Sequence, residues 1–202
     1  MAGLDDSITS VAFSETIRLR ASDQFERDFK AGAAGELFQV FELLSRLDPP
    51  LPTFTRDNWQ SVIRKFVTIL PEYSDMTAWH GRETADITYD DQDGVLTSLF
   101  IDKGYLRDDV WRGKTPRFYI EVKSSTADNR TPLFMSKHQY RRMQEMSNGE
   151  TQSDNMDMVY VIFRVYNLGQ QGMRVKVYVD PEVMRVRGEL LFTAEGWSVV
   201  PA

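Results

Sequence analysis

The chain has 202 residues, a formal net charge of -6 and no cysteine. Single hydrophobic cores grow comfortably to this length, so we expect one domain over 22–202, preceded by an N-terminal arm over 1–21. The lack of cysteine excludes disulfides, thiolate zinc sites and cysteine nucleophiles. No apolar run approaches a membrane helix and the first residues lack a signal-peptide pattern, which predicts an intracellular protein, nuclear or cytoplasmic, with no membrane contact.

The first predicted elements are two helices. Apolar residues follow a period of 3.6 between Gly35 and Leu47, within a longer helical stretch that starts near Asp23 and ends at the prolines of 48–52. A second helix is expected over 57–70, with Pro71 after its end. Its buried stripe is predicted to consist of Trp59, Val62, Ile63, Phe66 and Val67.

A short strand is expected over 85–89, followed by a segment whose structure is ambiguous. Ile87 and Tyr89 share one face of this strand, and the polar residues around them share the other. Asp93 and Gly94 suggest a hairpin turn, 95–101 fits either a strand or a helix, and 104–116 has the composition of a basic loop.

The remaining chain predicts three strands, one helix and a further strand region. Residues 118–123 alternate, so that Tyr119, Glu121 and Lys123 share one face, and a polar loop then leads to a helix beginning near Ser136. The apolar run 156–166 indicates a central strand, 174–179 an edge strand, and 190–200 one more strand or two short ones. We therefore predict an α/β (α+β) fold with a mixed central sheet flanked by helices.

One segment is basic although the chain as a whole is acidic. Between Lys103 and Arg142 there are ten Lys or Arg residues against four Asp or Glu residues. Such an excess is usually a solvated surface, but it also suits the phosphates of a nucleic acid, with Tyr105 or Trp111 stacking on an exposed base. The candidate phosphate contacts are Arg107, Arg112, Lys114, Arg117, Lys137, Arg141 and Arg142.

Glu121 and Lys123 lie side by side on a strand that is otherwise apolar. A solvent-facing ion pair is the ordinary explanation. If the strand that Asp86 opens pairs with theirs, however, Asp86 and Glu121 converge, and two adjacent carboxylates repel unless a cation binds between them. Carboxylate oxygens favour Mg²⁺ or Mn²⁺. Lys123 would then orient a water nucleophile or stabilise charge on a phosphate, and Asp90, on the same strand face, is a rival to Asp86.

Two further candidates also have ordinary explanations. Glu36 stands in the first turn of a helix, where an acid interacts favourably with the helix dipole. Gln139 follows Ser136 at the spacing of a helix capping box. His80 and His138 have no partner at ligand or catalytic spacing and are predicted to be ordinary surface or helix-end residues.

These positions also occur in an order that resembles a known family. The matching residues are Gly35 and Glu36, Asp86 and Ile87, the run Ile120 to Ser125, Phe134 to Ser136, and Gln139. They resemble the C-terminal domain family named after the protein NO VEIN, which belongs to the PD-(D/E)xK nuclease-like superfamily. The resemblance implies a restriction-endonuclease-like core.

The resemblance also implies residue roles. Asp86 and Glu121 would be metal ligands, joined by the Val122 carbonyl, and Lys123 would be catalytic. Glu36 would be a further ligand or hold a ligand water, and Gln139 would orient the site or contact a phosphate. Asp86 is preferred to Asp90 because Ala-Asp-Ile matches the family pattern.

The function expected from these residues is hydrolysis of phosphodiester bonds in nucleic acid, with DNA as the first expectation, by a Mg²⁺- or Mn²⁺-dependent endonuclease. Two alternatives remain open. The domain is a catalytically silent nucleic-acid-binding module, or it is a protein-interaction module with a protein partner or a fused domain. The net acidity and the N-terminal arm favour the second alternative, and the resembled family commonly occurs as one module of larger proteins.

Overall fold

The computed structural model describes residues 32–33, 35–68, 70–82 and 84–193. The predicted arm and the start of the first predicted helix lie outside these residues. The elements between Gly35 and Tyr73 are η1 (Gly35–Phe41, a π-helical segment), α2 (Glu42–Ser45), η2 (Arg56–Asn58), η3 (Val62–Val67) and η4 (Pro71–Tyr73). The elements that follow are β1 (Ile87–Asp90), α3 (Val95–Asp102), α4 (Asp108–Trp111), β2 (Arg117–Ser124), α5 (Lys137–Glu145), β3 (Met158–Tyr166), β4 (Arg174–Val179) and α6 (Pro181–Val186).

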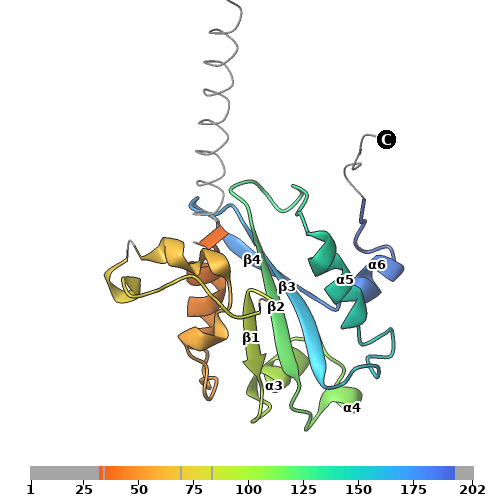
Figure 1. Cartoon of the computed structure of the whole chain (residues 1–202). Helices are drawn as coiled ribbons and strands as arrows, with labels where there is room; N and C mark the ends of the chain where they lie inside the picture. The colour runs from red at the N-terminus through yellow and green to blue at the C-terminus, as the bar shows by residue number, and fades with distance from the viewer. Residues whose placement is uncertain (1–31, 34, 69, 83, 194–202) are drawn as a thin grey trace, which may run out of the picture.

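Four strands form one mixed sheet in the order β1-β2-β3-β4 (Figure 1). Strand β2 is antiparallel to β1 and parallel to β3, and β4 is antiparallel to β3. A parallel pair requires a crossover connection, and α5 lies in the segment that joins β2 to β3. The predicted α/β architecture, a mixed sheet flanked by helices, is confirmed.

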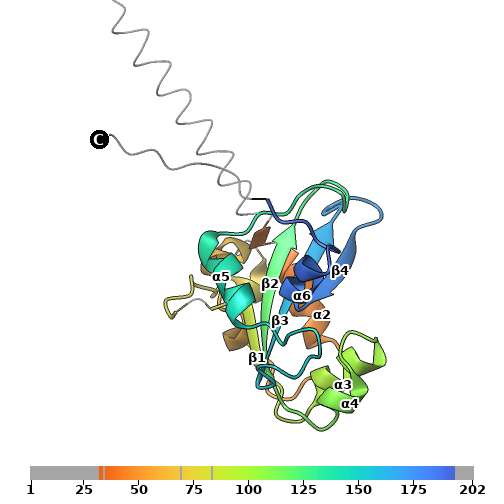
Figure 2. The same cartoon turned by 90° about the vertical axis from the view of Figure 1, so that its right-hand side faces the viewer.

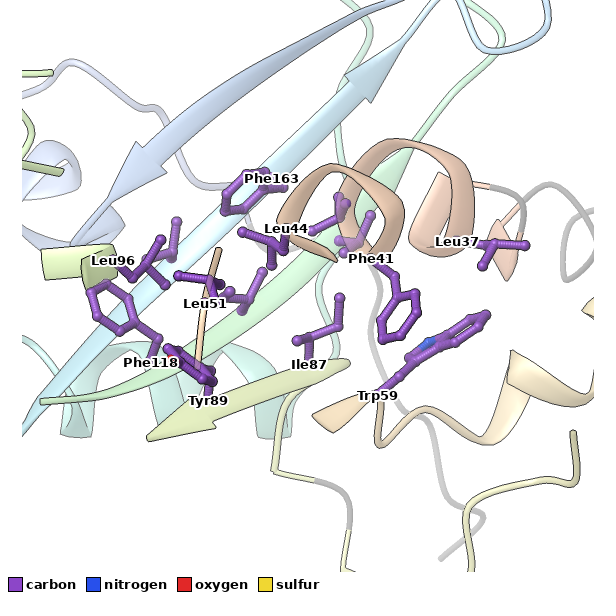
Figure 3. Packing of buried hydrophobic residues seen from close by; sticks show 14 of the residues in the cluster. Leu37, Phe41, Leu44, Leu51, Trp59, Ile87, Tyr89, Leu96, Phe118 and Phe163 are labelled. Atoms are coloured by element: carbon purple, nitrogen blue, oxygen red, sulfur yellow. The ribbon is translucent and has the colours of Figure 1, made fainter. Parts of the chain in front are cut away.

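The two faces of the sheet carry different side chains. The face that we call the η1 face presents apolar residues to η1 and α2, and these form the large core shown in Figure 3. The opposite face, which we call the α5 face, is covered by α5 and α6 (Figure 2). Apolar residues of the α5 face, Tyr160, Ile162 and Tyr178, pack with Met143 in a second, smaller cluster.

Helix α5 begins at the capping box that the sequence predicts. The Ser136 hydroxyl accepts a hydrogen bond from the Gln139 backbone N–H at 3.2 Å, and the Gln139 side chain accepts one from the Ser136 backbone N–H at 3.0 Å. These bonds satisfy two of the N–H groups that a helix start leaves unpaired. The cap therefore places Gln139 at a defined position, one turn before Met143 in the core.

The ambiguous segment 95–101 is a helix, and the expected hairpin turn before it is wrong. The Asp91 carboxylate accepts hydrogen bonds from the Leu96 and Thr97 backbone N–H groups at 3.1 and 2.7 Å. Gly94, with a φ of +68°, brings the chain back so that this carboxylate reaches the helix start. Capping by Asp91 therefore decides between the two alternatives.

The prediction of a second helix over 57–70 is wrong. The segment holds two short 3-10 turns, η2 and η3, separated by Trp59 in an extended conformation. Trp59 forms an antiparallel bridge with Ile87, and the Gln60 backbone N–H donates to the Asp86 carbonyl at 2.8 Å. Pairing with the open edge of β1 thus replaces helical hydrogen bonds. Trp59 and Val67 are buried as predicted, but Val62 is exposed.

Three smaller predictions are corrected or resolved. Residues 104–116 contain a helix, α4, rather than only a loop, and Trp111 is fully buried. Trp111 therefore cannot stack on an exposed base. Residues 190–193 contain no strand, and the rest of the predicted strand region lies outside the described residues. Within the part of the chain that the structure describes, no helix is long and apolar enough to cross a membrane.

Candidate functional site

Asp86 and Glu121 meet on the α5 face. Asp86 directly precedes β1 instead of opening it, and the register that pairs Ile87 with Ile120, continued by one residue, would set Asp86 opposite Glu121. Residues directly opposite on an antiparallel pair point to the same face with adjacent Cβ atoms. Both side chains are buried, with 6% and 1% of their surface exposed.

The Asp86 carboxylate occupies the position where β1 stops pairing with β2. Its Oδ2 accepts a hydrogen bond from the Val122 backbone N–H at 2.7 Å, and the Glu121 side chain is a further hydrogen-bond partner. Burial raises the pKa of Asp86, while Lys123 and the Val122 N–H oppose that shift. Asp86 therefore binds the backbone N–H of Val122. The expected role of the Val122 carbonyl as a metal ligand stays a prediction.

Besides Asp86, polar side chains of β2 and α5 contact the carboxylate of Glu121. The Gln139 Nε2 donates to Oε2 at 2.7 Å, and the Lys123 Nζ lies 3.7 Å from the same oxygen. The Arg142 Nη1 lies 3.6 Å from Oε1 and also donates to the Thr84 carbonyl. The pair of Glu121 and Lys123 is therefore not an exposed surface pair, since the two side chains are only 1% and 15% exposed.

Gln139 forms the capping box of α5 and also contacts the acidic cluster, while its role toward a substrate stays a prediction. Its Oε1 accepts from the Ser136 backbone N–H and from Lys123 Nζ, each at 3.0 Å, while its Nε2 donates to Glu121. Two donors on one side and a carboxylate on the other determine the orientation of the amide. The cap of α5 and the acidic cluster are thus joined through a single side chain, which holds the Lys123 amine in place.

Glu36 reaches the cluster from η1. Its Oε2 accepts from Trp59 Nε1 at 2.6 Å and its Oε1 from the Ser61 hydroxyl at 3.2 Å. Burial raises the pKa of Glu36 well above its usual value, and the negative charge of Asp86 raises it further. Gly35 permits this approach, because a Cβ at that position would lie 2.5 Å from the Ser124 Cβ.

The cluster is acidic and buried. Glu36, Asp86 and Glu121 interact electrostatically, and Lys123 and Arg142 are the cations among them. Desolvation disfavours three ionised carboxylates opposed by two cations, so the surplus negative charge is reduced by binding either a proton or a further cation. The chemistry available here is therefore cation binding or proton exchange next to a lysine amine.

A divalent cation fits part of this arrangement. Among the described residues, no three His, Cys, Asp or Glu side chains are grouped closely enough to hold a metal ion. Both oxygens of Glu36 accept hydrogen bonds from Trp59 and Ser61. An ion held by Asp86 and Glu121 would have to replace contacts of Glu121 with Gln139 or Arg142. Mg²⁺ is commonly held by one or two carboxylates with water and substrate phosphates as the other ligands. The residues fit such an ion and do not fit a cage built from protein alone.

The rival acid and part of the basic segment lie elsewhere. Asp90 is exposed and pairs with Arg117 at 3.5 Å, at the opposite end of β1 from Asp86. Arg112 and Lys114 precede β2, and Arg112 pairs with Asp108 at 2.5 Å. At roughly 3.3 Å per strand residue, the start of β2 is about 20 Å from Lys123, so these two side chains do not join the site.

The candidates on α5 divide into two groups. Lys137 and Arg141 are exposed, and Arg141 pairs with Glu145 at 3.1 Å. Arg142 is turned toward Glu121 instead of toward solvent. His80 and His138 are exposed, as predicted.

Several site residues gave no signal in the sequence. Trp59 and Ser61 were assigned to a helix, yet they hold Glu36. Tyr160 is fully buried beside Glu121, and burial together with that carboxylate raises the pKa of its hydroxyl. These contacts join residues far apart in the chain, and no local pattern encodes them. Comparison of the chain with protein-family models, with curated proteins and with solved structures finds no match.

Proposed function

We propose that the protein is a Mg²⁺- or Mn²⁺-dependent phosphodiesterase acting on nucleic acid, with DNA as its first expected substrate. The observation that carries the proposal is the pairing of buried Asp86 and Glu121 on one sheet face, with the Lys123 amine 3.7 Å from the Glu121 carboxylate. Carboxylates and a lysine so placed are the groups that metal-assisted hydrolysis of a phosphate ester requires. The mixed sheet and the order of these residues also support membership of the PD-(D/E)xK superfamily, which remains part of the proposal.

The proposed roles follow from the contacts. Asp86 and Glu121 would hold the ion, which when bound would activate a water molecule and neutralise charge on the phosphate. Lys123 would orient the attacking water or donate to a phosphate oxygen, and Gln139 would orient the amine of Lys123. Glu36 would act indirectly. It would hold a water molecule that is a ligand of the ion, and it would interact electrostatically with Asp86.

Cleavage assays with matched variants test the proposal. Plasmid and single-stranded DNA are incubated with the protein in Mg²⁺ or Mn²⁺, and product is followed on gels. Asp86→Asn, Glu121→Ala and Lys123→Ala are expected to reduce the rate by about 100-fold or more, the usual effect of losing a group that acts in the transition state. Asp90→Asn is the matched control, because this acid shares the strand face but is exposed and distant from Glu121. Absence of cleavage, or cleavage that survives Glu121→Ala, contradicts the proposal.

A nucleic-acid-binding module without catalysis is the second candidate. The Arg142 guanidinium lies 3.6 Å from Glu121 Oε1, so the structure already supplies a cation where an ion would bind. Thermal unfolding with and without Mn²⁺ separates the candidates, because a ligand that binds only the folded state stabilises it by about 2.7 kcal/mol at a hundredfold excess over its Kd. The catalytic proposal predicts a stabilisation that Glu121→Ala abolishes and Asp90→Asn keeps. No stabilisation of the wild type favours the silent module.

A further inference from the structure

Three basic residues stand directly opposite one another on three neighbouring strands. Lys123 on β2 is the register partner of Arg164 on β3, which is in turn the partner of Lys176 on β4. All three belong to the α5 face, so their side chains leave the same side of the sheet at a spacing of about 4.8 Å per strand. We call this set the cation row. It starts at the lysine of the candidate site.

The cation row is electrostatically unfavourable by itself. Like charges placed directly opposite each other destabilise a sheet. Among the described residues no acid forms an ion pair with Arg164 or Lys176, and Arg164 is only 2% exposed. Arg164 instead donates to the carbonyls of Lys123 and Thr131, at 3.4 and 3.1 Å. The guanidinium of Arg164 is thus buried against backbone carbonyls, and the exposed Lys176 is the member of the row that an anion reaches from solvent.

An apolar groove adjoins the cation row on the same face. Its floor contains Ile162 and Tyr178, which precede Arg164 on β3 and follow Lys176 on β4, and Ile162 is also the register partner of Glu121. The groove has a volume of about 870 Å³. Its walls include Phe134 and Leu191, which are 69% and 90% exposed.

The two features together describe a binding surface for a particular polymer. We propose that the groove and the exposed lysines beside it bind one unpaired strand of nucleic acid, with backbone phosphates at Lys176 and Lys137 and bases in the groove. Single-strand-binding surfaces combine a positive track for the backbone with aromatic side chains on which bases stack. Phe134, Tyr140 and Phe192 supply such rings, and Lys137 stands at the groove with a further positive charge.

The inference deepens the proposed function by naming an unpaired strand as its substrate. Ile162 lies beside Glu121, and the row begins at Lys123, so a strand bound in this way would pass the candidate site. In a duplex the bases are already stacked and paired, and their faces are not available to the groove.

Binding measured without divalent cations tests the inference. Fluorescence anisotropy of a labelled oligothymidylate is followed in EDTA over a range of salt concentrations, with a labelled duplex as competitor. Phe134→Ala is expected to weaken binding of the single strand by about 5- to 150-fold, the loss of one base–aromatic stack, with an unchanged salt dependence. Lys176→Gln is expected to reduce the slope of log affinity against log salt by about 0.7, one phosphate contact on a single strand.

Each variant has a matched control. Lys65→Gln removes an exposed lysine that lies over the Phe66 ring at 5.2 Å, much as Lys176 lies over Tyr178 at 5.0 Å, but it stands on η3, outside the row and the groove. Leu43→Ala removes an exposed apolar side chain of α2, the helix that packs on the η1 face. Both controls are expected to bind as the wild type does. A far-ultraviolet circular dichroism spectrum of each variant establishes that the fold is kept.

The outcomes for the inference and for the proposed function are distinguishable. The inference is overturned if the wild type does not bind the single strand, if it binds the duplex equally well, or if both groove and row variants bind like the controls. Binding that depends on Phe134 and Lys176 supports the inference even where no cleavage occurs, in which case only the catalytic proposal fails. If cleavage depends on Glu121 but neither Phe134→Ala nor Lys176→Gln affects binding, the catalytic proposal is supported and the inference of a single-strand surface is overturned.

Discussion

The two faces of the sheet are built on opposite principles. The η1 face is apolar along the strands apart from Ser124 at the end of β2, and its buried rings and aliphatic chains meet η1 and α2 (Figure 3). The α5 face has apolar residues in its middle but buries Asp86, Glu121 and Arg164. Burial of apolar area stabilises a fold, whereas burial of charge costs free energy unless partners compensate for it.

The difference indicates where the protein loses folding stability in order to keep ionisable side chains buried. The apolar side chains of the η1 face are explained by packing in the large core. In the acidic cluster, which Asp86 and Glu121 form on the α5 face and Glu36 approaches from η1, burial raises the pKa of both Asp86 and Glu36, which means that the fold holds these carboxylates in an unfavourable environment. Groups whose pKa is shifted in this way are more frequent at functional sites than in ordinary cores. Three predictions on stability test this division.

The largest effect is expected on the η1 face. Phe118 is fully buried and its ring packs edge-on against Phe100, with centroids 5.2 Å apart. Phe118→Ala is expected to lower the free energy of unfolding by about 3 to 5 kcal/mol, from lost transfer energy and the cavity that remains. Urea denaturation measures the change. Phe134→Ala, on an exposed ring, is the control and is expected to change stability by less than about 0.5 kcal/mol.

A smaller effect of opposite sign is expected at the edge of the cluster. The pKa of Glu36 is raised, so the native state retains its proton to higher pH than the unfolded state does. Its ionisation therefore costs no stability below the ordinary value of 4.5 and lowers stability as pH rises toward and through the native pKa. Glu36→Gln is expected to stabilise the protein at pH 7.5 by on the order of 1 kcal/mol, and less at pH 4.5.

Urea denaturation of both proteins at the two pH values checks this expectation. Glu189→Gln, at an exposed acid, serves as control and should show little effect at either pH. A Glu36→Gln protein that is less stable than the wild type by the same amount at both pH values would mean that hydrogen bonds to Trp59 and Ser61 dominate, and that no surplus charge is buried in the cluster.

The smallest effect is expected on the exposed side of α5. Arg141 is 71% exposed in its side chain and pairs with Glu145, 62% exposed, at 3.1 Å. Arg141→Gln is expected to change the free energy of unfolding by about 0.3 to 0.5 kcal/mol at most, because water and salt screen such pairs. A loss well above 1 kcal/mol in urea denaturation would show that the exposed charges of α5 contribute as much to stability as the buried ones. That result would contradict the division between the two faces of the sheet.

Local patterns predicted much of the fold. The alternation in 85–89, 118–123 and 174–179 and the apolar run in 156–166 indicated the four strands of the sheet, and Ser136 with Gln139 indicated the start of α5. Side-chain period and capping depend on neighbours in the chain, so they can be read without tertiary information. The segment 57–70 was misassigned for the opposite reason, since Trp59 pairs with Ile87 from a distant strand. A helical pattern does not reveal that competing partner.

The site divides in the same way. The sequence by itself determined that Glu121 and Lys123 share a strand face and that Gln139 caps the next helix, because these relations need only the period of one element. Only the tertiary structure decided that Glu121 meets Asp86 rather than Asp90, and that Lys123 aligns with Arg164. Strand register joins residues that are remote in the chain, and it is set by the packing of the whole sheet rather than by any one segment.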